Sequence, residues 1–122
     1  MSPRAKPAVS NARVKAAMLR SSAQIFAALG DETRLRLIAV LCAGSAMSIA
    51  QLTAGTEITR QSVTQHLQVL ANAGLVRDVK VGRERLWAFE PAHLDEARRA
   101  LEAISQQWDH ALLRLKAAVE GD

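Results

Sequence analysis

Residues 58–89 read ITRQSVTQHLQVLANAGLVRDVKVGRERLWAF, and this stretch decides the fold. Its first half predicts a helix from Thr59, a good N-cap residue, to about Ala73. Apolar residues recur there three and four residues apart, so that they form one buried stripe: Val63, Leu67 and Leu70. Gly74 ends this helix because glycine readily adopts the left-handed backbone of a helix C-terminus.

The second half of the stretch predicts a β-hairpin. β-Branched and aromatic residues recur at near-alternate positions in residues 75–81 and 83–89, on the two sides of Gly82. Basic side chains cluster around the predicted tip: Lys80, Arg83 and Arg85.

The outward face of the predicted helix is polar but almost uncharged: Gln61, Thr64, Gln65, Gln68 and Asn72. A helix face that only meets solvent usually collects Lys and Glu, whereas amides and hydroxyls are the groups that read base edges. An ordinary solvent-facing surface remains the alternative for this face alone. An amide-rich helix followed by a basic hairpin is typical of a recognition helix followed by a wing.

Upstream, residues 1–12 are expected to form a flexible basic arm, and a helix is expected from about Asn11 to Leu29. Asp31 should cap a second helix, over residues 33–42, whose predicted buried residues are Leu35, Ile38 and Leu41. A short third helix is expected from a Ser48 cap through Leu52, with its end at Gly55.

Pro91 opens the last predicted helix, over residues 91–120, which carries a heptad-like apolar seam. The chain has little left to cover this seam or the stripe of the first helix. We therefore expect a homodimer with these interface residues: Val14, Met18, Leu101, Ile104, Trp108, Leu112 and Leu115. Intramolecular packing of the two terminal helices is the alternative.

Length and composition fit one domain, with a DNA-binding part at 13–90 and a dimerisation helix at 91–120. Residues 1–30 carry five basic side chains and no acid, which favours a polyanionic partner. No apolar run is long enough for a membrane span, and residues 1–10 lack the apolar core of a secretory signal. A single cysteine, Cys42, excludes an intramolecular disulfide, and we expect a cytoplasmic protein.

Two motifs carry a family resemblance. Residues 25–37, IFAALGDETRLRL, resemble the opening signature of the ArsR/SmtB family of bacterial repressors, and residues 58–70 resemble its recognition helix. The similarity covers about residues 23–90. MarR-type repressors share the topology but lack the first signature.

The resemblance implies a mainly α winged helix-turn-helix with a small β-hairpin, homodimeric through its N- and C-terminal helices. It implies double-stranded DNA as the partner, with two recognition helices in successive major grooves of an inverted-repeat operator. The half-sites would lie about 34–36 Å apart, or a multiple of that. Repression would follow from occlusion of a promoter.

Many relatives sense metals, but the matching positions lack ligands. Ser48, Ala50 and Gln51 stand where metal-sensing relatives have cysteines, and the last helix lacks the required spacing of Asp, His and Glu. We therefore predict no metal, no cofactor and no identifiable small-molecule ligand. A metal- or redox-responsive repressor of the same fold is the alternative, although Cys42 is expected to be buried and unreactive.

Other classes of function fit less well. The sequence contains no phosphate-binding loop, nucleophile elbow or pair of catalytic carboxylates, so no catalytic residue and no enzyme is predicted. A protein-interaction adaptor could use the same C-terminal seam, but it would not require an amide-rich helix face or a basic wing.

Individual roles follow from these motifs. The expected base-reading residues are Arg60, Gln61, Thr64 and Gln65. The expected phosphate contacts from the same helix are Thr59, Ser62 and Gln68. Lys80, Arg83 and Arg85 should contact the DNA backbone or the minor groove. His66 lies close to the inward stripe and is expected to be packed and locally hydrogen-bonded.

Overall fold

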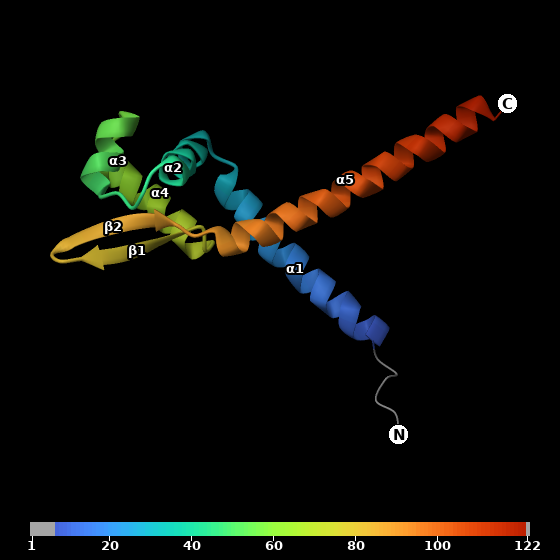
Figure 1. Cartoon of the computed structure of the whole chain (residues 1–122), viewed down its shortest axis with the longest axis horizontal. Coiled ribbons are helices and arrows are strands. Elements are labelled where there is room, and N and C mark those ends of the chain that lie inside the picture. The colour runs from blue at the N-terminus through green and yellow to red at the C-terminus, as the bar shows by residue number, and fades with distance from the viewer. Residues whose placement is uncertain (1–6, 122) are drawn as a thin grey trace, which may run out of the picture.

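The computed structural model describes the backbone of residues 7–121 and the side chains of residues 13–121. In chain order its elements are α1 (Pro7–Leu29), α2 (Glu32–Ala43), α3 (Ile49–Thr56), α4 (Arg60–Asn72), β1 (Val76–Val81), β2 (Glu84–Phe89) and α5 (Pro91–Glu120). Figure 1 shows α2, α3, α4 and the hairpin gathered into a head, from which α1 and α5 cross and then diverge. This is the winged helix-turn-helix fold that the sequence predicts.

The caps that the sequence predicts set the starts of three helices. The carboxylate of Asp31 accepts a hydrogen bond from the backbone N–H of Arg34 at 3.0 Å, which opens α2. This hydrogen bond holds the pKa of the Asp31 carboxyl below its usual value, helped by the charge of Arg34. Ser48 and Gln51 form a reciprocal capping box at α3, and the hydroxyl of Thr59 accepts from the N–H of Ser62 at 3.1 Å.

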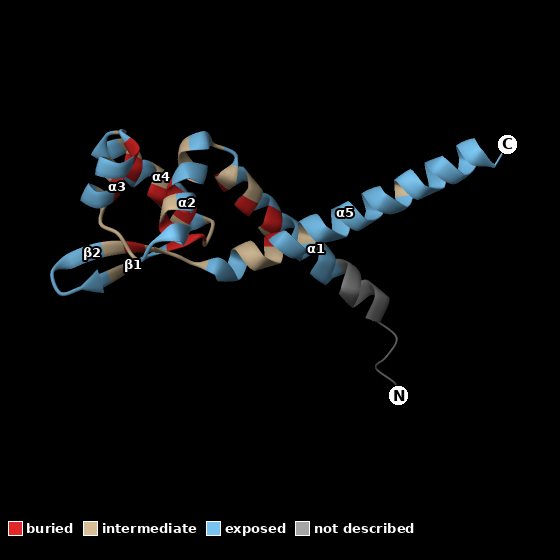
Figure 2. Cartoon of the chain, turned by 45° about the horizontal axis from the view of Figure 1, so that its top comes forward, coloured by how far each residue is buried: buried red, intermediate tan, exposed pale blue. Residues whose placement is uncertain are grey.

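One apolar core holds the head together. Its fully buried members come from α2, α3, α4 and the residue before β1, and they include the predicted stripe of α4: Leu37, Leu52, Val63, Leu67, Leu70 and Leu75. Burying each such side chain contributes about 1.5–3 kcal/mol. Figure 2 shows that the buried residues concentrate in the head and at the crossing of α1 and α5, whereas the distal part of α5 is exposed.

The hairpin is fixed by its turn and by a bridge to the α2–α3 linker. Val81 pairs with Glu84 across a two-residue loop. Gly82 has φ 64°, as the first loop position of a type II′ turn requires. Met47 in the linker exchanges two backbone hydrogen bonds with Trp87 of β2, at 2.9 and 2.7 Å. The wing is therefore joined to the helices through both strands: β1 follows α4 in the chain, and β2 is hydrogen-bonded to the α2–α3 linker.

Several local expectations were wrong. The first helix begins at Pro7, so residues 7–12 are helical, and residues 1–6 of the expected arm lie outside the described residues. Leu35 is exposed and Leu37 takes its place in the core, because α2 turns that side toward its neighbours. Cys42 is exposed, since the core ends one residue earlier at Leu41.

The end of α3 also differs from the expectation. Gly55 lies inside the helix, and Glu57 ends it in the left-handed conformation, with φ 57°. Within residues 7–121, no helix has the length and apolar character needed to cross a membrane.

Candidate nucleic-acid interface

Helix α4 presents its polar face to solvent because its apolar stripe points into the core. Val63, Leu67 and Leu70 are fully buried. The opposite side of the helix is exposed and contains most of the predicted contact residues: Arg60, Gln61, Thr64, Gln65 and Gln68. Thr59 is also exposed, and Ser62 is half-buried.

Hydrogen bonds within the protein distinguish these side chains. The hydroxyl of Thr64 donates to the carbonyl of Arg60 at 2.9 Å, so its oxygen remains free only to accept. The side-chain amide of Gln68 donates to Asn72 at 3.2 Å. In the described part of the chain, the amides of Gln61 and Gln65 have no hydrogen-bond partner, so their donors and acceptors are available for a base edge.

A hollow of about 520 Å³ separates the start of α4 from the wing. Its lining combines predicted contact residues with the start of α3 and the first residue of β2: Ser48, Ile49, Ala50, Arg60, Gln61, Thr64, Glu84 and Arg85. The structure therefore brings Arg60, Gln61 and Thr64 together with Arg85 at one concave surface, although Arg85 is 21 or more positions farther along the chain. Gln65, Lys80 and Arg83 lie outside this lining.

The three basic side chains of the wing are not equivalent. Arg85 forms an ion pair with Asp78 at 2.9 Å and lies over the ring of Trp87, 5.2 Å from its centroid. Lys80 and Arg83 are exposed, and among the described residues neither has a carboxylate within ion-pair distance. The Arg85–Asp78 pair is itself exposed, so exchanging the carboxylate for a phosphate costs little.

Sequence reasoning missed Glu84, which lines the same hollow as Arg60 and Gln61. A carboxylate can accept a hydrogen bond from the N4 amino group of cytosine and repels phosphate. The signal was its position directly after the tip, where it alternates with Arg83 and Arg85.

His66 is half-buried and its partner is not local. Its Nδ1 atom lies 3.3 Å from Nη1 of Arg34 on α2, which is 32 residues away in the chain. His66 is packed as expected, but its polar partner lies on α2, so the contact connects α4 to α2.

The predicted interface residues of the terminal helices are exposed. Helices α1 and α5 pack where they cross (Figure 1), but the predicted apolar interface residues on both helices are exposed, and Trp108 is 63% exposed. A cleft of about 320 Å³ between the two helices is lined by Lys15, Met18, Leu19, Arg99, Ala100, Ala103, Ile104 and Gln107. Packing of the terminal helices within one chain thus leaves the seam of α5 open.

The positions considered for a metal are occupied by other interactions. Ser48 and Gln51 bond to one another in the capping box, and Asp95 is paired with Arg98 and Arg99, which lowers the pKa of its carboxyl. Among the described residues, no group of three or more His, Cys, Asp or Glu side chains is placed to hold a metal ion.

Comparison with known proteins agrees with this geometry. Residues 29–79 match a protein family described as "Helix-turn-helix domain". The HTH-type transcriptional regulator Rv2034 of Mycobacterium tuberculosis is 32% identical over 93 residues, which cover 76% of this chain and 83% of that protein.

Solved structures show the same likeness. An ArsR-like transcriptional regulator from Rhodococcus sp. RHA1 is 37% identical and superposes with a TM-score of 0.70, over 80% of this chain and 92% of that one. A homodimeric winged helix-turn-helix domain from Mycobacterium bovis shares the fold at 22% identity, with a TM-score of 0.59 over 80% of this chain and 87% of that one. The sequence signature, the fold and these relatives establish that the chain belongs to the ArsR/SmtB family of DNA-binding transcriptional regulators, which are not enzymes.

Proposed function

We propose that the protein is a homodimeric repressor that binds an inverted-repeat operator through α4 and the wing. The observation that carries this proposal is the exposed face of α4, where Gln61 and Gln65 have free amides and Gln61 shares a hollow with Arg60 and Arg85. Amide groups recognise adenine bidentately and guanidinium groups recognise guanine.

The phosphate contacts are proposed for the edges of this surface. Thr59 and Ser62 at the start of α4, and Gln68 farther along it, would fix the position of the helix in the groove. Lys80 and Arg83 extend the basic surface to the wing tip, where Arg85 would exchange Asp78 for a phosphate.

Homodimerisation is proposed from the uncovered seam of α5 and the exposed side chains of Val14 and Met18 on α1. The proposed α5 residues are Leu101, Ile104, Trp108, Leu112 and Leu115. A second copy is the economical cover, and the homodimeric relative from Mycobacterium bovis supports it. Two-fold symmetry then requires an operator with inverted half-sites. Because the residues around Ser48 and Asp95 offer no ligand set, we propose that binding does not require a metal.

The test is selection from a random-sequence duplex library with the full chain, followed by footprinting of the recovered sequences. We expect an inverted repeat with half-sites about one or two helical turns apart. Recovery of unrelated sequences, with affinities equal to that for the starting library, would contradict sequence-specific binding. A promoter fused to the recovered site then tests repression in a reporter strain.

A further inference from the structure

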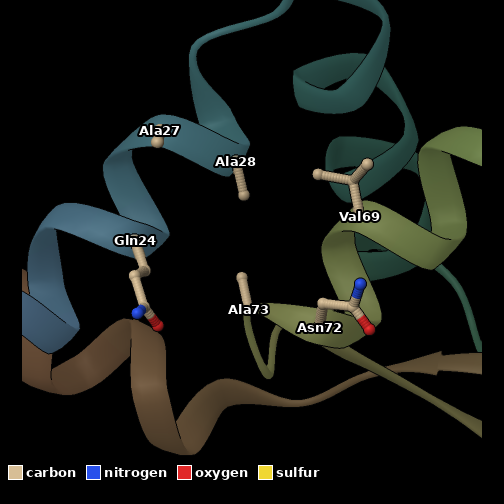
Figure 3. Close-up of a pocket in the computed structure, with 6 residues that line it drawn as sticks. All are labelled: Gln24, Ala27, Ala28, Val69, Asn72 and Ala73. Atoms are coloured by element: carbon tan, nitrogen blue, oxygen red, sulfur yellow. The ribbon is translucent and has the colours of Figure 1, made fainter.

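Two hollows border the recognition helix, and their linings differ in chemistry. Figure 3 shows the one between α1 and the C-terminal half of α4, with a volume of about 400 Å³. Its lining residues are small, apolar or amide-bearing, and none of them is charged: Gln24, Ala27, Ala28, Val69, Asn72 and Ala73. The hollow between the start of α4 and the wing is lined instead by two arginines and an acid, Arg60, Arg85 and Glu84. A lining with both kinds of charge suits a ligand that presents acceptors and donors side by side.

Glu84 is a free acceptor among basic neighbours. Its side chain is exposed, and within residues 13–121 no cationic group lies at ion-pair distance from it. Arg83 and Arg85 flank it in the chain, but Arg85 pairs with Asp78 at 2.9 Å. Its position is fixed, because it is the first residue of β2 and pairs with Val81 across the turn. An ionised carboxylate accepts hydrogen bonds and cannot donate, so both oxygens of Glu84 are available to a donor outside the protein.

A second side chain in the hollow has the same requirement. Thr64 donates its hydroxyl proton to the carbonyl of Arg60 at 2.9 Å, so its oxygen can only accept. The guanidinium group of Arg60 has donors only. A phosphate group, which offers only acceptors, would satisfy Arg60 but would leave Thr64 without a donor and would repel Glu84. The lining as a whole therefore fits a surface that offers both acceptors and donors.

The major-groove edge of a G·C base pair has this pattern. Guanine presents two acceptors, N7 and O6, which a guanidinium group binds bidentately, and cytosine presents its N4 amino group, from which a carboxylate accepts. Thymine presents an acceptor, O4, and a methyl group instead, so a carboxylate at that place would be repelled. A guanidinium group and a carboxylate on one hollow are thus complementary to G·C and not to A·T.

We propose that Glu84 is a specificity-determining residue: it accepts a hydrogen bond from the cytosine of a G·C pair whose guanine binds Arg60, and it rejects thymine at that position. This inference rests on the proposed DNA-binding function and names a base pair that the hollow selects. It also explains an acid on a basic surface. Glu84 weakens binding to every duplex through repulsion of phosphate, and this loss is recovered only where cytosine supplies a donor.

The experiment is selection from a random-sequence duplex library, in parallel with the wild-type full chain and with Glu84→Gln. The amide of glutamine can accept from cytosine N4 and can also donate to thymine O4, so it should not distinguish the two bases. We expect one position in each half-site at which the wild type recovers cytosine and the variant recovers both pyrimidines. Exchanging that G·C pair for A·T should weaken wild-type binding about tenfold, which corresponds to about 1.4 kcal/mol, and should leave binding by the variant almost unchanged.

The matched control is Glu120→Gln, which makes the same change of charge at an exposed position at the end of α5 and should keep the wild-type preference. Arg60→Ala should relax the preference for guanine in the same base pair. The inference is overturned if Glu84→Gln strengthens binding to every duplex equally, because Glu84 would then act only by repelling phosphate. It is also overturned if the two proteins recover the same bases at every position. If neither protein selects any sequence, the proposed function fails, and the inference fails with it.

Discussion

Gly74, which ends the recognition helix, lies directly against the imidazole ring of His93 near the start of α5. A Cβ atom at Gly74 would lie 2.5 Å from Cδ2 of His93, and the glycine has φ 79°. The link from α4 to the wing therefore requires a residue without a side chain for two reasons, the backbone conformation and the neighbouring ring.

We expect Gly74→Ala to lower the free energy of unfolding by about 1–3 kcal/mol, because it adds backbone strain to a steric conflict. The measurement is chemical unfolding followed by circular dichroism. His93→Ala alone should cost little because this ring is exposed, and in the Gly74→Ala background it should relieve only the conflict. Full recovery in the double variant would show that the positive φ contributes nothing.

The free amides of α4 should carry sequence recognition. Gln61→Ala and Gln65→Ala should each weaken binding to a selected duplex by about 1–3 kcal/mol and relax the preference at one base position, without changing stability. Fluorescence anisotropy with single-base variants of the duplex measures both effects. Gln106→Ala, at an exposed position on α5, is the matched control. Unchanged affinity in both α4 variants would remove this face from the DNA.

The wing should act through phosphate contacts. Arg83→Ala and Arg85→Ala should each reduce the magnitude of the slope of log K against log salt by about 0.9, similarly for selected and scrambled duplexes. Asp78→Asn should strengthen binding, because it frees Arg85 from its carboxylate partner. Arg114→Ala removes an exposed cation from α5 and should leave the slope unchanged. Equal slopes for the wing variants and the parent would exclude the wing from the contact.

Trp108 should be central to self-association. Its side chain is 63% exposed in one chain, and that of Leu113 is 62% exposed. Trp108 lies on the heptad seam, whereas Leu113 lies off it and serves as the control. Trp108→Ala should weaken the dimer by about 3–5 kcal/mol, the usual cost of truncating a large buried side chain. Leu113→Ala should leave it unchanged. Sedimentation equilibrium decides this, and a monomeric parent at micromolar concentration would reject the homodimer.

Metals and chelators should leave DNA binding unchanged. Ser48 and Gln51 are engaged in a cap and Asp95 in ion pairs, so no described set of ligands is ready to receive an ion. The measurement is a titration of the protein–DNA complex with zinc, copper, cadmium and arsenite, with Cys42→Ser as a parallel sample. A change in affinity of about 5–150-fold, the range of allosteric effectors, would reveal a site that this reasoning missed.

Local signals allowed most of the fold to be predicted from the sequence. The stripe of Val63, Leu67 and Leu70 and the caps at Asp31, Ser48 and Thr59 depend on residues three or four positions apart, and the structure has them as expected. The hairpin was also predictable, since Gly82 separates two alternating segments.

Tertiary packing decided the rest. Leu35 and Leu37 are equally apolar, and only the neighbours of α2 determine which one is buried. Gly55 could end a helix, yet Glu57 does so two residues later. The contact between Arg34 and His66, the placement of Glu84 and Arg60 on one hollow and the pairing of Arg85 with Asp78 depend on distances that no sequence spacing gives.

The backbone bridge between Met47 and Trp87 has a mechanical consequence. Because it anchors the wing to the linker between α2 and α3, while β1 follows α4 directly in the chain, we expect the wing and α4 to move as one unit. In the proposed complex, the distance between their two contacts with DNA would then be set by the fold. The separation of the two heads in a dimer would depend instead on the angle at which α1 and α5 cross. Tolerance for operators of different spacer length would therefore reside in the terminal helices.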